Sequence, residues 1–135
     1  MILTLATMVG IPLKAYVHQL HENNPPLEPC ITPDTSPRFW TPTMAKTYAY
    51  SYMKMTYPNW NRGEWKALLK LWGKESAWDH TAENPDSSAY GIAQVLHTKK
   101  GTPAPQQVAR GLSYIVHRYD KPSVAWSHWR KHGWY

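Results

Sequence analysis

The sequence holds little that could cross-link it or anchor it in a membrane. Cysteine occurs once, at Cys30, so no disulfide can form within the chain and an ordinary thiol is the expected state of that residue. No apolar run is long enough for a membrane span, and the apolar residues 1–13 lack both a basic leader and a small-residue cleavage site. We therefore expect neither a membrane span nor a signal peptide.

Acidic residues and phenylalanine are also scarce. Nine Asp and Glu stand against fifteen Lys and Arg, and the formal net charge of +6 favours an anionic partner such as a cell-wall polymer, a nucleic acid or a membrane surface. A single Phe accompanies eight Trp and nine Tyr, so most aromatic side chains can stack through one face and keep a polar group available. This bias suits a partner made of sugars or nucleobases.

The chain divides into a proline-rich beginning and a helical remainder. Residues 13–20 repeat apolar side chains at helical spacing, and residues 24–42 then carry six prolines, which disfavour both helix and sheet. We expect residues 1–42 to form an extended N-terminal arm with one short helix, and residues 43–135 to form one domain. An arm with so little core-forming periodicity is suited to binding a protein partner.

The remainder is predicted to be mainly α-helical. Apolar periodicity places four helices over residues 43–57, 61–75, 102–119 and 123–131. Thr43 and Thr102 are the expected caps of the first and third helices, and Asn61 with Glu64 forms a variant capping box at the second. Turn residues around a short apolar run predict a small β-hairpin over residues 86–97.

Each predicted helix carries an apolar stripe that we expect to face the core. The stripes are Met44, Tyr48, Tyr52 and Met55, then Trp65, Leu68, Leu69 and Trp72, then Val108, Leu112, Ile115 and Tyr119, and finally Val124 and Trp126. A second stripe on the 61–75 helix consists of Lys66, Lys70 and Lys74. We interpret these lysines as a solvated face.

Glu75 differs from the other acidic residues because it continues an apolar stripe. It follows Trp72 by three residues and Leu68 by seven, so on a helix it lies among apolar side chains. A carboxyl in such surroundings is poorly hydrated as an anion, its pKa rises, and it can donate a proton near neutral pH, as a glycosidase acid does. The alternative is an ordinary ion pair between Glu75 and Lys74.

Three motifs resemble soluble lytic transglycosylase domains in their order along the chain. They are Trp72-Gly73-Lys74-Glu75-Ser76-Ala77-Trp78, Ala89-Tyr90-Gly91-Ile92-Ala93-Gln94 and Gly111-Leu112-Ser113-Tyr114-Ile115. The resemblance covers about residues 60–135 and implies a lysozyme-like fold that cleaves peptidoglycan. By the same resemblance Glu75 is the catalytic acid, and the implied substrate-binding residues are Ser76, Tyr90, Gln94, Tyr114 and Trp126.

The chain departs from the family pattern in several places. Residues 91–94 read Gly-Ile-Ala-Gln where the family has Gly-Leu-Met-Gln, and residues 125–127 read Ala-Trp-Ser where it has Ala-Tyr-Asn. The second change removes a tyrosine hydroxyl and an amide, so hydrogen bonding in that corner of the site is expected to differ. The ending Gly-Trp-Tyr at 133–135 is similar to variants from phage and actinobacterial proteins, which implies a virion-associated or otherwise secreted protein that acts on the bacterial wall.

The implied reaction uses one carboxylic acid and no metal or organic cofactor. Glu75 would protonate the glycosidic oxygen while the N-acetyl group of the substrate captures the developing cation, and the 6-hydroxyl of the sugar would then close a 1,6-anhydro ring. This scheme is an exception to the two-carboxylate rule for glycosidases.

Two alternatives stay open. One is hydrolysis as in goose-type lysozymes, with Asp79 or Asp86 as the second carboxylate, and the other is a non-catalytic module that binds cell wall or nucleic acid. No recognition helix or zinc framework is recognisable, so a nucleic-acid partner is not expected. His128 and His132 are four residues apart but have no neighbouring Cys or Glu, so no metal site is expected.

Overall fold

A computed structural model describes residues 39–135 of the chain. All but the last four residues of the expected N-terminal arm, including its short helix, lie outside the described residues. Helices make up most of the described part, in the order α2 (Pro42–Thr56), α3 (Arg62–Glu75), α4 (Ala104–Tyr119) and α5 (Pro122–His132). The prediction of a mainly α-helical domain is confirmed.

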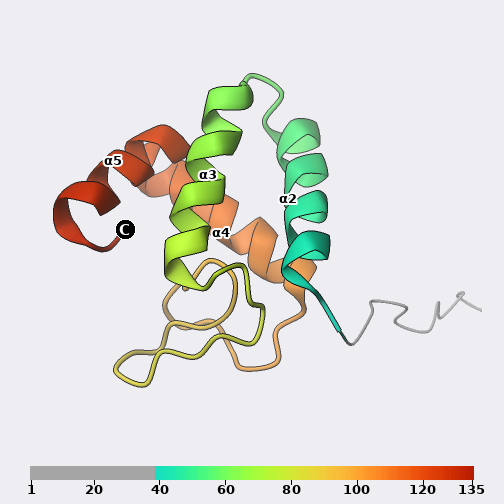
Figure 1. Cartoon of the computed structure of the whole chain (residues 1–135), viewed down its shortest axis with the longest axis vertical. Helices are drawn as coiled ribbons and strands as arrows, with labels where there is room; N and C mark the ends of the chain where they lie inside the picture. Colours follow the sequence, from blue (N-terminus) through green and yellow to red (C-terminus); the bar gives the residue numbers. More distant parts are fainter. Residues whose placement is uncertain (1–38) are drawn as a thin grey trace, which may run out of the picture. The chain divides into compact units, whose positions relative to one another are not determined.

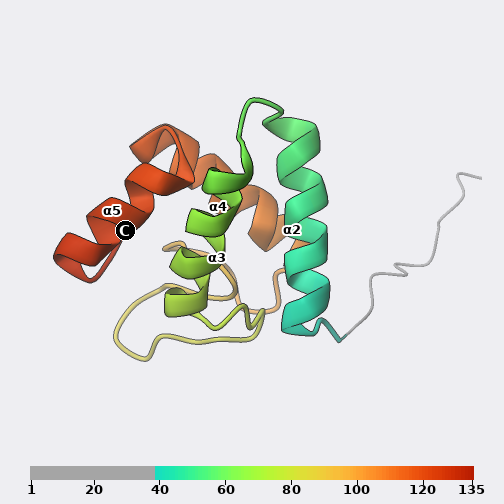
Figure 2. The same cartoon turned by 45° about the horizontal axis from the view of Figure 1, so that its top comes forward.

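Helix α3 lies at the centre of the arrangement (Figure 1, Figure 2). It has α2 on one side and α5 on the other, and α4 crosses behind it. The long connection from residue 76 to residue 103 folds against the end of α3. Because Glu75 is the last residue of α3, its carboxyl lies where a helix end meets this connection.

Helix α2 begins two residues before the expected position. Thr41 is the capping residue in place of Thr43, because its Oγ1 accepts a hydrogen bond from the backbone N–H of Met44 at 3.2 Å. Pro42 occupies the first turn, where its missing N–H removes no helical hydrogen bond. Residues 41 and 42, which the sequence assigns to the arm, therefore belong to the start of this helix.

The buried face of α2 is not the expected stripe. It consists of Ala45, Ala49 and Met53. In the expected stripe Met44 and Met55 are 38% and 76% exposed, and Tyr48 and Tyr52 are half-buried at the edge of the core. Alanine contributes little to apolar periodicity, but its small side chain allows α2 to pack closely on α4. Tyrosine suits the edge of the core, where its hydroxyl stays in water.

Half of the expected capping box forms at the start of α3. The Asn61 side-chain oxygen accepts hydrogen bonds from the backbone N–H groups of Gly63 and Glu64 at 2.7 and 3.3 Å. The second half, a hydrogen bond from the backbone N–H of Asn61 to the Glu64 carboxylate, does not form. The carboxylate accepts hydrogen bonds from the backbone N–H and the hydroxyl of Ser123 at 2.8 and 2.9 Å, and so joins α3 to the start of α5.

Helix α4 has the expected core face but not the expected cap. Val108, Leu112, Ile115 and Tyr119 are all buried, which confirms the predicted stripe. The helix starts at Ala104, and Thr102 donates its hydroxyl to the backbone oxygen of Lys99 at 2.7 Å instead of capping α4. Pro103 is the residue before the helix.

Helix α5 matches the prediction in its extent and less well in its core face. It ends at His132, and Gly133 follows with the left-handed conformation expected of a helix terminator, at φ 79°. Val124 is 43% exposed and Trp126 is half-buried, so the expectation that both lie in the core is wrong for Val124. Pro122 and Ala125 fill the core instead, because they point from α5 toward α3 and α4.

The segment expected to form a hairpin holds two isolated antiparallel bridges and no paired strands. Tyr90 pairs with Glu83 in one bridge and with Val95 in the other. Between them Gly91 and Gln94 take positive φ values of 80° and 49°, which are incompatible with an extended ladder. The segment is therefore a compact series of turns. Within residues 39–135, no helix is long and apolar enough to cross a membrane.

Gly111 marks a close approach of α4 to its neighbours. A Cβ at this position would lie 2.4 Å from the Cβ of Ala93 and 2.6 Å from Cζ2 of Trp72, and both side chains are buried. We expect Gly111→Ala to lower the free energy of unfolding by up to about 2 kcal/mol, because an overpacking cost of about 1–3 kcal/mol exceeds the roughly 1 kcal/mol that alanine gains in a helix. Urea denaturation measures this change.

Gly73→Ala is the matched control on α3. A Cβ there meets nothing within 4 Å, so this substitution should stabilise the chain by about 0.5–1 kcal/mol. A stabilising effect at Gly111 as well would show that α4 can move away from Trp72 without cost.

Candidate active site

Glu75 ends α3 with its carboxyl half-buried. The Oε1 atom is shielded from water and has no hydrogen-bond partner within residues 39–135. Burial raises the pKa of Glu75, and an interaction with the Trp129 side chain partly opposes that rise. The ion pair with Lys74 considered as an alternative is absent from the described part of the chain. The direction of the pKa shift is the one that the apolar stripe predicts.

Tyr135 forms one wall beside Glu75. Its hydroxyl accepts a hydrogen bond from Nε1 of Trp72 at 2.9 Å and donates one to the backbone oxygen of Ala93 at 2.5 Å. Burial, together with the nearby Glu75 charge, raises the pKa of Tyr135 well above its ordinary value. Local sequence patterns do not place Tyr135 in the site, because its partners are 63 and 42 residues away along the chain.

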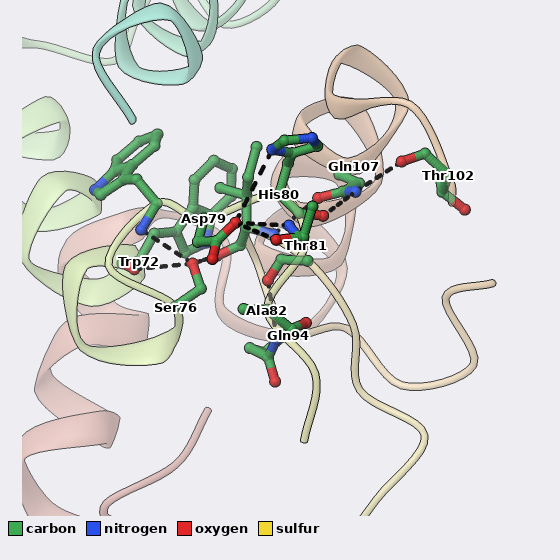
Figure 3. Close-up of polar contacts among 12 residues, drawn as sticks. Trp72, Ser76, Asp79, His80, Thr81, Ala82, Gln94, Thr102 and Gln107 are labelled. Atoms are coloured by element: carbon green, nitrogen blue, oxygen red, sulfur yellow. Dashed lines mark hydrogen bonds and ion pairs between the residues drawn. The ribbon is translucent and has the colours of Figure 1, made fainter. Parts of the chain in front are cut away.

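Ser76 joins the end of α3 to the segment that follows Tyr90. Its hydroxyl donates to the backbone oxygen of Ile92 at 2.6 Å and accepts from the backbone N–H of Trp78 at 3.1 Å (Figure 3). Ala77 and Trp78 then take positive φ values of 54° and 67°, so the chain turns sharply after the helix. The serine expected to contact substrate is thus engaged with backbone, and it holds two motifs together.

Gln94 is also bound to backbone. Its amide nitrogen donates to the backbone oxygens of Ala82 and Gly91 at 3.1 and 2.9 Å (Figure 3). Both bonds use the nitrogen, so the side-chain oxygen is the atom left to accept a hydrogen bond from a ligand. Tyr90 lies in the same segment, half-buried, at the residue shared by both bridges.

The two remaining predicted site residues, Tyr114 and Trp126, contact aromatic side chains that lie near Glu75. Tyr114 on α4 meets the ring of Tyr135 edge-on, with centroids 5.6 Å apart. Trp126 on α5 stacks on Trp129 at 5.4 Å. The Trp129 side chain lowers the pKa of Glu75, and the Glu75 charge raises the pKa of Tyr135, so both residues lie near the carboxyl. Tyr114 and Trp126 each contact one of these two neighbours.

Gln107 is a buried residue of this region that the sequence analysis missed. Its side-chain oxygen accepts from the backbone N–H of Ile92 at 2.8 Å, and its nitrogen donates to the backbone oxygens of His80 and Thr102 at 2.9 and 2.7 Å (Figure 3). A Cβ on Gly91 would lie within 2.8 Å of three atoms of this amide, which explains the glycine. One sequence signal could have identified Gln107: it is a polar residue one turn before Gly111 on a buried helix face, and a buried polar side chain needs hydrogen-bond partners.

The other two candidate carboxylates have different surroundings. Oδ1 of Asp79 accepts hydrogen bonds from the backbone N–H and the hydroxyl of Thr81, both at 2.8 Å, and these bonds lower the pKa of Asp79. Asp86 is exposed in the turn after Pro85. In residues 39–135, moreover, no three His, Cys, Asp or Glu side chains are grouped so that they could hold a metal ion.

Comparison of the chain with protein-family models, curated proteins and solved structures finds no match. The resemblance to soluble lytic transglycosylase domains therefore rests on the motifs in the sequence. What the structure adds is the placement of those motifs relative to one another and to Glu75.

The raised pKa of Glu75 makes stability depend on pH in a definite direction. The folded pKa lies above the ordinary value of 4.5, so the proton contributes stability that is fully present below 4.5 and is lost as pH rises through the folded pKa. We expect Glu75→Gln, which needs no proton, to be more stable than the natural chain at pH 8. This advantage should disappear at pH 4, as thermal unfolding across this range can show.

Asp79→Asn provides a control of opposite sign. The folded pKa of Asp79 is lowered, so its stabilising contribution is present above the ordinary value of 3.8 and is lost on acidification. This variant should be less stable than the natural chain at pH 8, and the deficit should shrink toward pH 3. A pH-independent difference for Glu75→Gln would mean that its carboxyl is not desolvated.

Proposed function

We propose that this chain is a peptidoglycan lytic transglycosylase with a lysozyme-like fold, and that Glu75 is its catalytic acid. The observation that carries the proposal is the convergence of three motifs that lie far apart in the sequence. Ser76 links the first motif to the backbone of Ile92 in the second, and Gly111 in the third packs against Trp72 and Ala93. Glu75 directly precedes Ser76, and among residues 39–135 its desolvated carboxyl has no ionic partner.

The proposed reaction begins with Glu75 protonated, the state that its raised pKa favours. The carboxyl gives its proton to the glycosidic oxygen as the bond from C1 of N-acetylmuramic acid to that oxygen breaks. The neighbouring N-acetyl oxygen bonds to C1 and takes up the positive charge. The Glu75 carboxylate then removes the proton of the 6-hydroxyl, whose oxygen displaces the N-acetyl oxygen from C1, so a 1,6-anhydro ring forms and Glu75 is protonated again.

Substrate assistance is preferred to hydrolysis because, within residues 39–135, no second carboxylate shifts the pKa of Glu75. Only burial and the Trp129 side chain shift the pKa of Glu75, whereas a nearby anion would raise the pKa further by repulsion. Asp79 has one carboxylate oxygen fixed by Thr81, and Asp86 lies in an exposed turn. Neither resembles a base that positions water beside a buried acid.

Charge and composition support the choice of a wall polymer as substrate. The formal net charge of +6 favours a strand that carries carboxylates, and the many Trp and Tyr side chains suit sugar rings. A partner for residues 1–42 in a virion or at the cell surface stays a prediction, because nearly all of that arm lies outside the described residues.

Loss of wall clearing in Glu75→Gln tests the assignment of the acid. The amide keeps the shape of the side chain but has no transferable proton, so activity should fall by about 100-fold or more while circular dichroism stays unchanged. Zymograms of purified cell walls measure the activity. Asp120→Asn removes one negative charge from an exposed turn and should leave clearing intact. Clearing by a folded Glu75→Gln chain would exclude Glu75 as the acid.

The chemical nature of the cut ends distinguishes the transglycosylase from a lysozyme. Digested strands should carry 1,6-anhydromuramic ends, because the attacking group is the 6-hydroxyl of the sugar and not water. Such ends are lighter than hydrolytic ends by one water and resist borohydride, so mass spectrometry before and after reduction separates them. If reducible muramic ends predominate, hydrolysis is the reaction, and Asp79→Asn or Asp86→Asn should then abolish activity.

A further inference from the structure

A cleft lies at the opposite end of α3 from Glu75. Its lining consists of Tyr50, Met53 and Lys54 on α2 and of Asn61, Arg62 and Trp65 at the start of α3. Figure 1 shows the turn that joins these two helices. Its volume of about 440 Å³ lies within the range of about 300–1,000 Å³ that is typical of ligand sites. Thirteen residues separate Arg62 from Glu75 on α3, which corresponds to roughly 20 Å along the helix axis.

Aromatic and apolar side chains form one wall and the floor of this cleft. The rings of Tyr50 and Trp65 meet edge-on with centroids 5.1 Å apart, and Tyr50 is 45% exposed. Met53 is fully buried beneath them. Such a surface offers an apolar face for a flat ligand or a sugar ring and keeps the tyrosine hydroxyl accessible for a hydrogen bond.

Two cations complete the lining. Lys54 and Arg62 are exposed, and the part of the chain that the structure describes provides no carboxylate in ion-pairing distance of either. Arg62 is the first residue of α3, where a positive charge is unfavourable because it opposes the helix dipole. The Asn61 side-chain oxygen is used in capping, so its amide nitrogen remains as a further donor.

We propose that this cleft is a second binding site for the wall strand, which holds a carboxylate-bearing amino sugar at a distance from the point of cleavage. Arg62 and Lys54 bind the carboxylate, and a guanidinium can do so with two parallel hydrogen bonds. Tyr50 and Trp65 contact the sugar face. The choice of ligand rests on the proposed function, while the chemistry of the cleft itself requires only an anionic group beside an apolar ring face.

The carboxylate has two sources in peptidoglycan, and binding measurements can separate them. The Glu75→Gln chain is titrated with peptide-free glycan strands, which expose the lactyl carboxylate of muramic acid, and with strands that keep their stem peptides. Neutral chitin oligosaccharides serve as the uncharged reference. We expect tighter binding to one or both carboxylate-bearing strands than to chitin oligosaccharides, and the tighter of the two identifies the source. Equal affinity for chitin would overturn the proposal.

Paired substitutions test whether the cleft is responsible. Lys54→Gln with Arg62→Gln should weaken binding of the carboxylate-bearing strands about tenfold or more. Lys66→Gln with Lys70→Gln removes the same charge from the solvated face of α3 and should have little effect. If both double variants lose the same affinity for the strands, the effect is one of overall charge and the proposal is overturned. Displacement of the strands by a DNA oligonucleotide of equal charge would overturn it in favour of a nucleic-acid site.

The outcome for the cleft is separable from the outcome for catalysis. With Glu75 intact, the Lys54→Gln and Arg62→Gln chain should cleave short soluble fragments at the natural rate, because the cleft lies away from the carboxyl. Its clearing of intact walls should fall. A chain that binds strands through the cleft but releases no fragments would support this inference and contradict the proposed transglycosylase.

Discussion

The contact between Trp72 and Gly111 determines where Glu75 lies. The indole of Trp72 is fully buried and occupies the space that a side chain at position 111 would need, so α3 and α4 approach closely at this point. The hydroxyl of Tyr135 fixes the indole nitrogen from the other side. Because Glu75 follows Trp72 by one turn on the same face, this contact also directs the carboxyl toward the core.

Side-chain hydrogen bonds from the helices hold the connection that faces Glu75. Two isolated bridges cannot satisfy the backbone groups of residues 76–103, and buried backbone groups without partners are costly. Gln107 on α4 binds three of them, and Ser76 at the end of α3 binds two more. The motif segments around the carboxyl are therefore anchored to the core helices even though no sheet supports them.

The features that the sequence predicts well are those that depend on neighbours along one helix. Amphipathic spacing predicts all four described helices, and it places Glu75 among apolar side chains, where its pKa is raised. Prediction fails where a small residue defines the core, as Ala45 and Ala49 do in α2. It also fails where two threonines compete for a cap beside a proline, because Thr41 and Thr43 have similar local sequence contexts.

Local sequence patterns cannot predict the contacts that complete the candidate site. The partners of Tyr135 are 63 and 42 residues away, and two of the three partners of Gln107 are 15 and 27 residues away, so spacing within one helix cannot identify these contacts. The family resemblance directs attention to Tyr114 and Trp126, whose rings contact Tyr135 and Trp129. The motifs thus indicate which residues lie near the Glu75 carboxyl, while the packing of the helices determines which side chains are its direct neighbours.

Helix α3 breaks the usual charge preference at both ends, and the two breaks coincide with the two candidate sites. A helix favours anions in its first turn and cations in its last, and Glu64 and Lys74 follow that rule. Arg62 and Glu75, its first and last residues, oppose the rule, and neither has an ionic partner in the described part of the chain. Sequences keep such local conflicts chiefly where function requires them. Under the proposed function, the acid must hold its proton at one end of α3, and under the proposed second site a cation must stay free for an anionic ligand at the other.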